Sequence, residues 1–214
     1  MAVLRILIAD DHELIRRGLA AALGDRPEWT IVAEAADGRQ AVALATRTMP
    51  DIAVLDLTMP GLNGLEATRQ IRAALPRVRV LIVTAHESEQ LVREVLEAGA
   101  LGYVLKSDAG RTLVQAIESL RDERPFFTSA IARHVVDGYL SAAQGAARAP
   151  PLTPRERHII QLLAEGRSNK DVAHLLHISP KTVETHRANV MRKMGFESLA
   201  DLVRYAVRNR IIEA

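Results

Sequence analysis

The sequence contains no cysteine, and this absence removes several classes of function at once. Without cysteine there are no disulfides, no zinc sites built on thiolates and no cysteine nucleophile. No run approaches the roughly 20 apolar residues that a membrane-spanning helix requires. The apolar opening, residues 1–9, reaches Asp10 and Asp11 too early for a signal peptide. These absences predict a cytoplasmic protein with no membrane association.

Glycine-rich phosphate loops are also missing. Neither G-x-G-x-x-G nor G-x-x-x-x-G-K-[ST] occurs, which argues against nucleotide hydrolysis and dinucleotide redox chemistry. The composition that is present is ordinary for a globular protein, with 48% hydrophobic and 25% charged residues. This apolar content excludes disorder of the whole chain, and the length of 214 residues suits one large domain or two small ones.

Charge and composition divide the chain near residue 150. Residues 1–125 carry a formal net charge of −3, residues 126–150 carry +1 and residues 151–214 carry +4. The stretch SAAQGAARAPP has little to bury and ends in Pro-Pro, which cannot continue a helix. We therefore predict a domain at 1–125, a linker helix and flexible linker at 126–150, and a domain at 151–214. The positive charge of the last domain favours an anionic partner.

The first 125 residues alternate apolar, strand-like runs with helical patterns. Five strands are predicted at 3–9, 30–35, 52–57, 80–84 and 102–105. The helices are predicted to begin near Glu13, Gly38, Asn63, Ser88 and Arg111. Strongly apolar strands that alternate with helices predict an α/β fold with a doubly wound, five-stranded parallel sheet covered on both faces.

Polar residues follow the ends of four of these predicted strands. Asp10 and Asp11 end the first strand, Asp56 the third and Thr84 the fourth, and Lys106 follows the fifth. The carboxyl ends of the strands in an open α/β sheet meet at one rim, where ligands bind. Clustered carboxylates repel one another unless a cation lies between them, and Mg²⁺ prefers oxygen ligands. The sequence therefore predicts a magnesium site at this rim.

The same residues could carry out a phosphoryl transfer. A carboxylate beside Mg²⁺ and lysine can act as a nucleophile and form an aspartyl-phosphate, and Asp56 on the central strand is the candidate. Lys106 and the metal would offset the charge on the transferred group. A single aspartate at a strand end is more often a cap or turn residue, but all five positions together favour a site.

Four segments of the first domain resemble the receiver domain of two-component response regulators, over about residues 3–122. They are IADDHELIRRGL, DIAVLDLTMPGLNGLEATRQIR, VLIVTAHES and GALGYVLKSDA. The resemblance implies the flavodoxin-like receiver fold and transfer of a phosphoryl group to Asp56 from a sensor histidine kinase. It also implies that Asp11 and Asp56 bind Mg²⁺ directly, together with the Thr58 carbonyl, while Asp10 helps through water.

The resemblance to receivers implies a switch as well. In that family the hydroxyl at the Thr84 position turns toward the phosphoryl group, and the aromatic side chain at the Tyr103 position then moves inward. The surface around the fourth helix, fifth strand and fifth helix changes with it. The residues alone leave Tyr103 open to simple core or edge packing. Ser107 stands where many receivers have a proline, so no proline geometry is carried over there.

The last 64 or so residues show clear signals for helix ends. A capping box from Thr153 to Glu156, with proline at the first helical position, opens one helix, which stops at Gly166. Three more helices are predicted from N-caps at Ser168 or Asn169, at Ser179 and at Ser198. A short helix, a tight turn and a longer polar helix form a helix-turn-helix, so an all-α, four-helix domain is predicted.

The longer helix, about residues 180–194, has two faces. Val183, Val190 and Met194 recur at helical spacing and are predicted to pack inward. The other face has no large apolar residue and can enter a major groove, while the helix N-terminus can hold a phosphate. The predicted DNA-binding residues are Lys181, Thr182, Glu184, Thr185, Arg187, Ala188, Arg192 and Lys193. The charge pattern alone suits a solvated helix face equally well.

The segment LTPRERHIIQLLAEGRSNKDVAHLLHISPKTVETHRANVMRKMG resembles the LuxR-type DNA-binding domain, over about residues 150–212. This implies base reading by Glu184 and Thr185, with Ala188 able to touch only a thymine methyl. A receiver followed by this domain is the NarL/FixJ layout, in which the last helix, here 199–208, helps to pair DNA-bound domains. The implied partners are a sensor histidine kinase, double-stranded promoter DNA, RNA polymerase and, when phosphorylated or DNA-bound, a second copy of the chain.

Two other functions compete with a phosphorylation-controlled transcriptional regulator. A hydrolase that works through an aspartyl-phosphate would need a second, acid–base carboxylate, typically two residues after the nucleophile, where Thr58 stands. A passive dimerisation scaffold would not need all five residues of the acidic site. The sequence therefore favours a regulator that is not an enzyme.

Overall fold

A computed structural model describes residues 3–129, 131–133, 152–209 and 211–212. The chain divides into two compact units, residues 1–145 and 146–214, and each is described by itself. The predicted flexible linker lies outside the described residues, as does most of the helix predicted at 128–140. Within that segment, residues 129 and 131–133 are helical. No helix in the described ranges has both the length and the apolar character needed to cross a bilayer.

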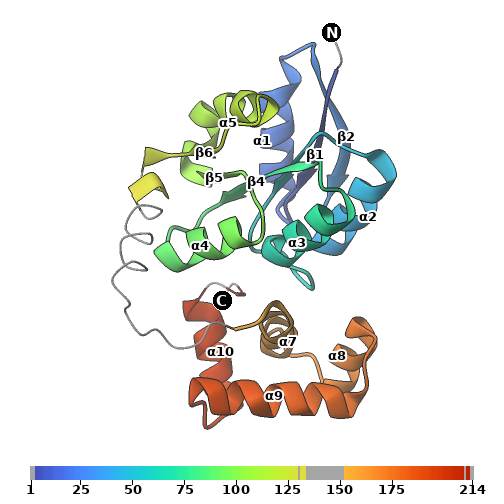
Figure 1. The fold of residues 1–214 in the computed structure, drawn as a ribbon, viewed down its shortest axis with the longest axis vertical. Helices are drawn as coiled ribbons and strands as arrows, with labels where there is room; N and C mark the ends of the chain where they lie inside the picture. Colours follow the sequence, from blue (N-terminus) through green and yellow to red (C-terminus); the bar gives the residue numbers. More distant parts are fainter. Residues whose placement is uncertain (1–2, 130, 134–151, 210, 213–214) are drawn as a thin grey trace. The chain divides into compact units, whose positions relative to one another are not determined.

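The first unit is a parallel sheet with helices on both faces (Figure 1). The strands lie in the order β2-β1-β3-β4-β5-β6, and every neighbouring pair is parallel. Their bounds are β1 Leu4–Ala9, β2 Trp29–Ala35, β3 Ile52–Leu55, β4 Arg79–Thr84, β5 Gly102–Leu105 and β6 Phe126–Phe127. All four residues of β3 are buried, as expected of a central strand that is covered on both sides.

Two hydrophobic clusters fill the two faces of this sheet. The helices are α1 Glu13–Gly24, α2 Gly38–Thr48, α3 Gly64–Ala74, α4 Glu89–Glu97 and α5 Lys106–Arg121. Buried residues of α2, α3 and α4 join one cluster, with Ala41, Ile71 and Val95 among them. Buried residues of α1 and α5, such as Leu23 and Ile117, join the other. This layering leaves the strand ends open at the rims of the sheet.

The predicted fold class, a parallel-sheet α/β domain followed by an all-helical domain, is confirmed. Two details differ from the prediction. The sheet has a sixth strand, β6, whose two residues are too few to give a periodic signal. Helix α5 begins at Lys106 and not near Arg111, because its first turn is polar and hides the helical period. Asp108 in that turn suits the positive end of the helix dipole.

The second unit contains α7 Pro154–Ala164, α8 Asn169–Leu176, α9 Pro180–Met194 and α10 Leu199–Arg208. Each helix begins at a capping side chain that accepts a backbone N–H bond; these caps are Thr153, Ser168, Ser179 and Ser198. Val183 and Val190 are fully buried in the core of this unit, and Met194 packs against it, as predicted. The opposite face of α9 is therefore directed away from the core.

Candidate functional site

The acidic site of the first unit lies where β1 and β3 end side by side. Their register pairs Ala9 with Leu55, so that Asp10 and Asp56 follow as neighbours. The Asp56 N–H donates to the Ala9 carbonyl at 2.7 Å, which fixes the backbone at this point. The chain order reverses between these strands, and such a switch point is where open α/β sheets bind ligands.

The next strands bring two more predicted residues to the same rim. Thr84, the last residue of β4, pairs with Leu105 of β5, and Lys106 then opens α5. The Lys106 ammonium lies 2.8 Å from Asp10 Oδ2 and 3.0 Å from Asp56 Oδ2. Asp10 and Asp56 are 1% and 3% exposed. Two buried carboxylates therefore share one ammonium, and the pocket keeps a net negative charge.

Burial raises the pKa of Asp56 to about 7, and the charges of Asp10 and Asp11 add to this effect, while the Lys106 ammonium opposes it. Burial acts to lower the pKa of Lys106, but Asp56 and Asp10 outweigh it, so that pKa lies above its usual value. Lys106 is therefore charged at neutral pH. Asp56 is poised to lose its proton when a further cation arrives.

The donor set fits a hard divalent cation. Ligand atoms of Asp10, Asp11, His12 and Asp56 all lie within 4.8 Å of one another. Apart from the Lys106 ammonium, Asp10 Oδ2 and Asp56 Oδ2 have no hydrogen-bond partner among the described residues, and the buried Thr58 Oγ1 has none. Buried oxygens without partners are costly, and Mg²⁺ binds such carboxylate and carbonyl oxygens. The acidic pocket is thus typical of a magnesium-binding phosphoacceptor site.

The two predicted switch residues meet at His86. The His86 N–H donates to Thr84 Oγ1 at 3.3 Å, and the Tyr103 hydroxyl donates to the His86 carbonyl at 2.9 Å. Thr84 and Tyr103 are both fully buried, so Tyr103 already occupies an inward position. Burial raises the pKa of Tyr103, which keeps its hydroxyl protonated as a donor. The sequence analysis missed this link, because nothing in the spacing pairs the backbone of residue 86 with a side chain on β5.

The raised pKa of Asp56 predicts a pH-dependent stability when no divalent cation is bound. The folded state holds the Asp56 proton up to a pH of about 7, and the unfolded chain only up to about 3.8. Between these values the folded state binds more protons, so its stability falls as the pH rises. We expect Asp56→Asn to remove this dependence and to stabilise the unit at pH 8 by a few kcal/mol at most, on the order of 1.4 kcal/mol per pKa unit.

Urea unfolding followed by fluorescence measures this effect. The chain has one tryptophan, Trp29, which is 7% exposed in β2, so its emission reports the first unit alone. Wild type and Asp56→Asn are compared in EDTA from pH 4 to pH 8. Parallel stability curves for the two proteins would contradict the assignment of the titration to Asp56.

The second unit presents the predicted DNA-binding residues on α9. Five of them are exposed on the surface, and Arg187 and Lys193 are half-buried; the exposed residues named in the prediction are Lys181, Thr182, Glu184, Thr185, Ala188 and, near the C-terminus, Arg192. The Thr185 hydroxyl donates to the Lys181 carbonyl at 3.0 Å. Lys193 differs from the rest, because its ammonium donates to Glu156 Oε2 of α7 at 2.9 Å.

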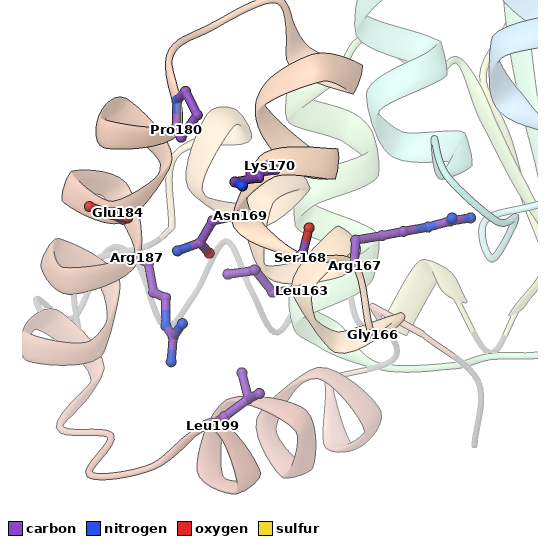
Figure 2. A pocket seen from close by; sticks show the side chains of 10 residues that line it. All are labelled: Leu163, Gly166, Arg167, Ser168, Asn169, Lys170, Pro180, Glu184, Arg187 and Leu199. Carbon is purple, nitrogen blue, oxygen red and sulfur yellow. The ribbon is translucent and has the colours of Figure 1, made fainter.

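A groove of about 490 Å³ lies between the start of α8, the face of α9 and the start of α10 (Figure 2). Its polar lining residues are Arg167, Ser168, Asn169, Lys170, Glu184 and Arg187. Figure 2 shows Arg187 reaching from α9 toward Leu199, while Arg167 extends away from the turn before α8. The sequence analysis missed Arg167 and Lys170, since it assigned DNA contacts to the longer helix alone.

The comparisons with known proteins match both units. Residues 6–118 match the response regulator receiver domain, and residues 150–206 match the bacterial regulatory proteins of the luxR family. The chain belongs to the NarL/FixJ family of two-component response regulators. This family consists of DNA-binding transcriptional regulators and not of enzymes, and its receiver domains work with histidine kinases.

Relatives resemble this response regulator along its whole length. The transcriptional regulatory protein LiaR of Bacillus subtilis (strain 168) is 36% identical over 210 residues, which cover 98% of this chain and 100% of LiaR. The crystal structure of a LuxR-family response regulator from Aurantimonas sp. SI85-9A1 is 41% identical, with a TM-score of 0.62, over 65% of this chain and 99% of that one. The response regulator ChrA of a heme-sensing two-component system is 32% identical, with a TM-score of 0.53, over 99% and 100%.

Proposed function

We propose that this response regulator accepts a phosphoryl group on Asp56 from a sensor histidine kinase and thereby controls its binding to promoter DNA. The observation that carries the proposal is the buried pair of carboxylates that shares the Lys106 ammonium at the switch point of the sheet. An uncompensated carboxylate beside a fixed cation suits an anionic nucleophile whose product is a phosphoryl anion.

In the transfer, an Asp56 carboxylate oxygen attacks the phosphorus of the phosphohistidine. The new O–P bond forms as the N–P bond breaks, and the kinase imidazole keeps the electron pair of that bond. Lys106 binds a phosphoryl oxygen and offsets its charge. Mg²⁺ held by Asp11, Asp56 and the Thr58 carbonyl, with Asp10 acting through water, neutralises further charge on that group. Thr84 and Tyr103 then report the phosphoryl group to the surface through His86.

The exposed face of α9 would read bases in the major groove. Glu184 is an acceptor only, and the Thr185 hydroxyl proton is already used on the Lys181 carbonyl, so this side chain also offers an acceptor. Two adjacent acceptors suit the exocyclic amino groups of cytosine or adenine. Ala188 adds contact with a thymine methyl, while the α9 N-terminus at Lys181 and Thr182 binds a phosphate.

The cations beside this face would track the phosphate backbone. Lys170 and Arg187 line the α8–α9 groove without a hydrogen bond or ion pair in the described part of the chain. Arg192 adds a further exposed cation near the end of α9. Phosphate contacts position a protein on DNA but carry no sequence information.

Two substitutions should separate these roles. Lys170→Ala is expected to weaken binding to all duplexes alike and to reduce the slope of log affinity against log salt by about 1. Glu184→Ala should change the preferred sequence and leave the salt slope close to that of wild type. Selection from a random duplex library, followed by anisotropy titrations at several salt concentrations, measures both. A changed sequence preference in Lys170→Ala with an unchanged salt slope would overturn the assignment.

The complete proposal includes a dimer on DNA. Residues 1–125 form the receiver domain, 126–150 the linker and 151–214 the DNA-binding domain. Phosphorylation favours pairing of two chains, helped by α10, so that two α9 helices reach half-sites about 34 Å apart. Promoter binding in the cytoplasm then affects RNA polymerase.

A further inference from the structure

The helix α9 is fastened at its C-terminal end to the first turn of α7. Lys193 Nζ donates to Glu156 Oε2 at 2.9 Å, and the two side chains are 22% and 13% exposed. The same oxygen accepts the Thr153 N–H at 2.8 Å. One carboxylate oxygen therefore closes the capping box of α7 and also holds the last turn of α9, although 37 residues separate its two ends.

The neighbouring residue of α7 makes a second connection. Arg155 Nη2 donates to the Leu176 carbonyl at 3.0 Å, at the C-terminal end of α8. The first turn of α7 thus holds both helices of the helix-turn-helix at their C-terminal ends. We call Arg155, Glu156 and Lys193, with the Leu176 carbonyl, the α7 clamp.

The Glu156–Lys193 pair differs from the surface ion pairs of the same unit. Arg204 and Asp201 lie three residues apart on one helix, with side chains 62% and 28% exposed, and such pairs contribute little. Burial acts to raise the pKa of Glu156, but the hydrogen bonds from Lys193 and Thr153 outweigh it, so the pKa lies below its usual value. Glu156 is therefore charged throughout the neutral range and its bond to Lys193 persists.

We propose that Glu156 and Lys193 are positioning residues for DNA recognition. In this assignment, which rests on the proposed function, Lys193 acts through Glu156 and not by touching a phosphate. Glu184 lies nine positions before Lys193 on α9, or about 13 Å along the helix axis at 1.5 Å per residue. A tilt of about 5° at the clamped end would move the base-reading residues by about 1 Å, and sites tolerate only about 0.5 Å.

Charge removal on each side of the pair tests this proposal in the full-length chain. The variants are Lys193→Met, Glu156→Gln and both together; glutamine keeps an oxygen that can accept the Thr153 N–H, so the capping box survives. The probes are the duplex that wild type selects from a random 20-base-pair library, a length of about two helical turns, and a scrambled duplex. We expect Lys193→Met to bind the selected duplex about 10-fold more weakly, to bind the scrambled duplex as wild type does, and to keep the wild-type salt slope.

The double variant and two controls complete the experiment. The double variant should be no weaker than Lys193→Met, because both changes remove one interaction. Lys193→Arg should restore affinity for the selected duplex. Arg192→Met, a change of the adjacent exposed cation, should weaken both duplexes and lower the salt slope by about 1.

Two results would overturn different parts of the account. If Lys193→Met behaves as Arg192→Met does, Lys193 is a phosphate contact and the positioning role is wrong. An effect in Lys193→Met that adds fully to that of Glu156→Gln has the same consequence. If wild type enriches no sequence at all, sequence-specific DNA binding fails, and the proposed function fails with it.

Discussion

Replacement of Asp56 by asparagine is expected to abolish phosphorylation. Wild-type protein incubated with Mg²⁺ and acetyl phosphate should gain the mass of one phosphoryl group, stable in acid and labile in base, as an acyl phosphate is. The Asp56→Asn variant should gain none, because the amide is no nucleophile and the two remaining carboxylates, Asp10 and Asp11, serve the cation in the proposed mechanism. Intact mass spectrometry measures the result directly.

The matched control for this substitution lies at the other end of the same strand. Asp51 immediately precedes β3, and its carboxylate accepts the Arg5 N–H at 2.8 Å. Asp51→Asn should therefore be phosphorylated as wild type is. Full phosphorylation of Asp56→Asn would show that another residue is the acceptor, and loss of phosphorylation in Asp51→Asn would show that the assay responds to general damage of β3.

Gly64→Ala is expected to have the largest effect on stability. A Cβ at this first residue of α3 would lie 2.0 Å from the Asp56 carbonyl oxygen and 3.1 Å from the Leu57 Cα. Backbone atoms cannot give way as the end of a side chain can, so the turn after β3 must shift. We expect a loss of about 3 kcal/mol or more, at the upper end of overpacking costs. The phosphoacceptor should also be displaced.

Gly110→Ala in α5 is the matched control, because it makes the same chemical change where space is available. No heavy atom lies within 4 Å of a Cβ built there. Replacement of a mid-helix glycine by alanine should stabilise the protein by about 0.5–1 kcal/mol. Urea unfolding followed by Trp29 emission measures both variants. Equal effects of the two substitutions would contradict the close approach of α3 to the Asp56 backbone.

The strand ends carried most of the predictable information about the receiver site. Asp10, Asp56, Thr84 and Lys106 each follow or end a recognisable apolar run, so their meeting at one rim follows from a parallel sheet. The distances, the shared Lys106 ammonium and the raised pKa of Asp56 could not be predicted, because they depend on burial and on the rotamers at the rim. The start of α5 was wrong because its first turn has no apolar residue.

The second unit illustrates the same limit in another way. Caps and spacing predicted the four helices and the inward direction of Val183 and Val190, since these are local features. Lys193 looked like any other cation on α9, and only its contact with Glu156, from a helix 37 residues earlier, sets it apart. Contacts between distant segments leave no periodic signal in the sequence.

The most direct test of the central claim compares DNA affinity with and without the phosphoryl group. Wild type and Asp56→Asn are each titrated, with and without acetyl phosphate and Mg²⁺, against the duplex that wild type selects. We predict that phosphorylation tightens wild-type binding about 5- to 150-fold, the range of a coupling of about 1–3 kcal/mol, and leaves Asp56→Asn unchanged. Equal affinity of phosphorylated and unphosphorylated wild type would contradict the account and make the receiver a passive scaffold.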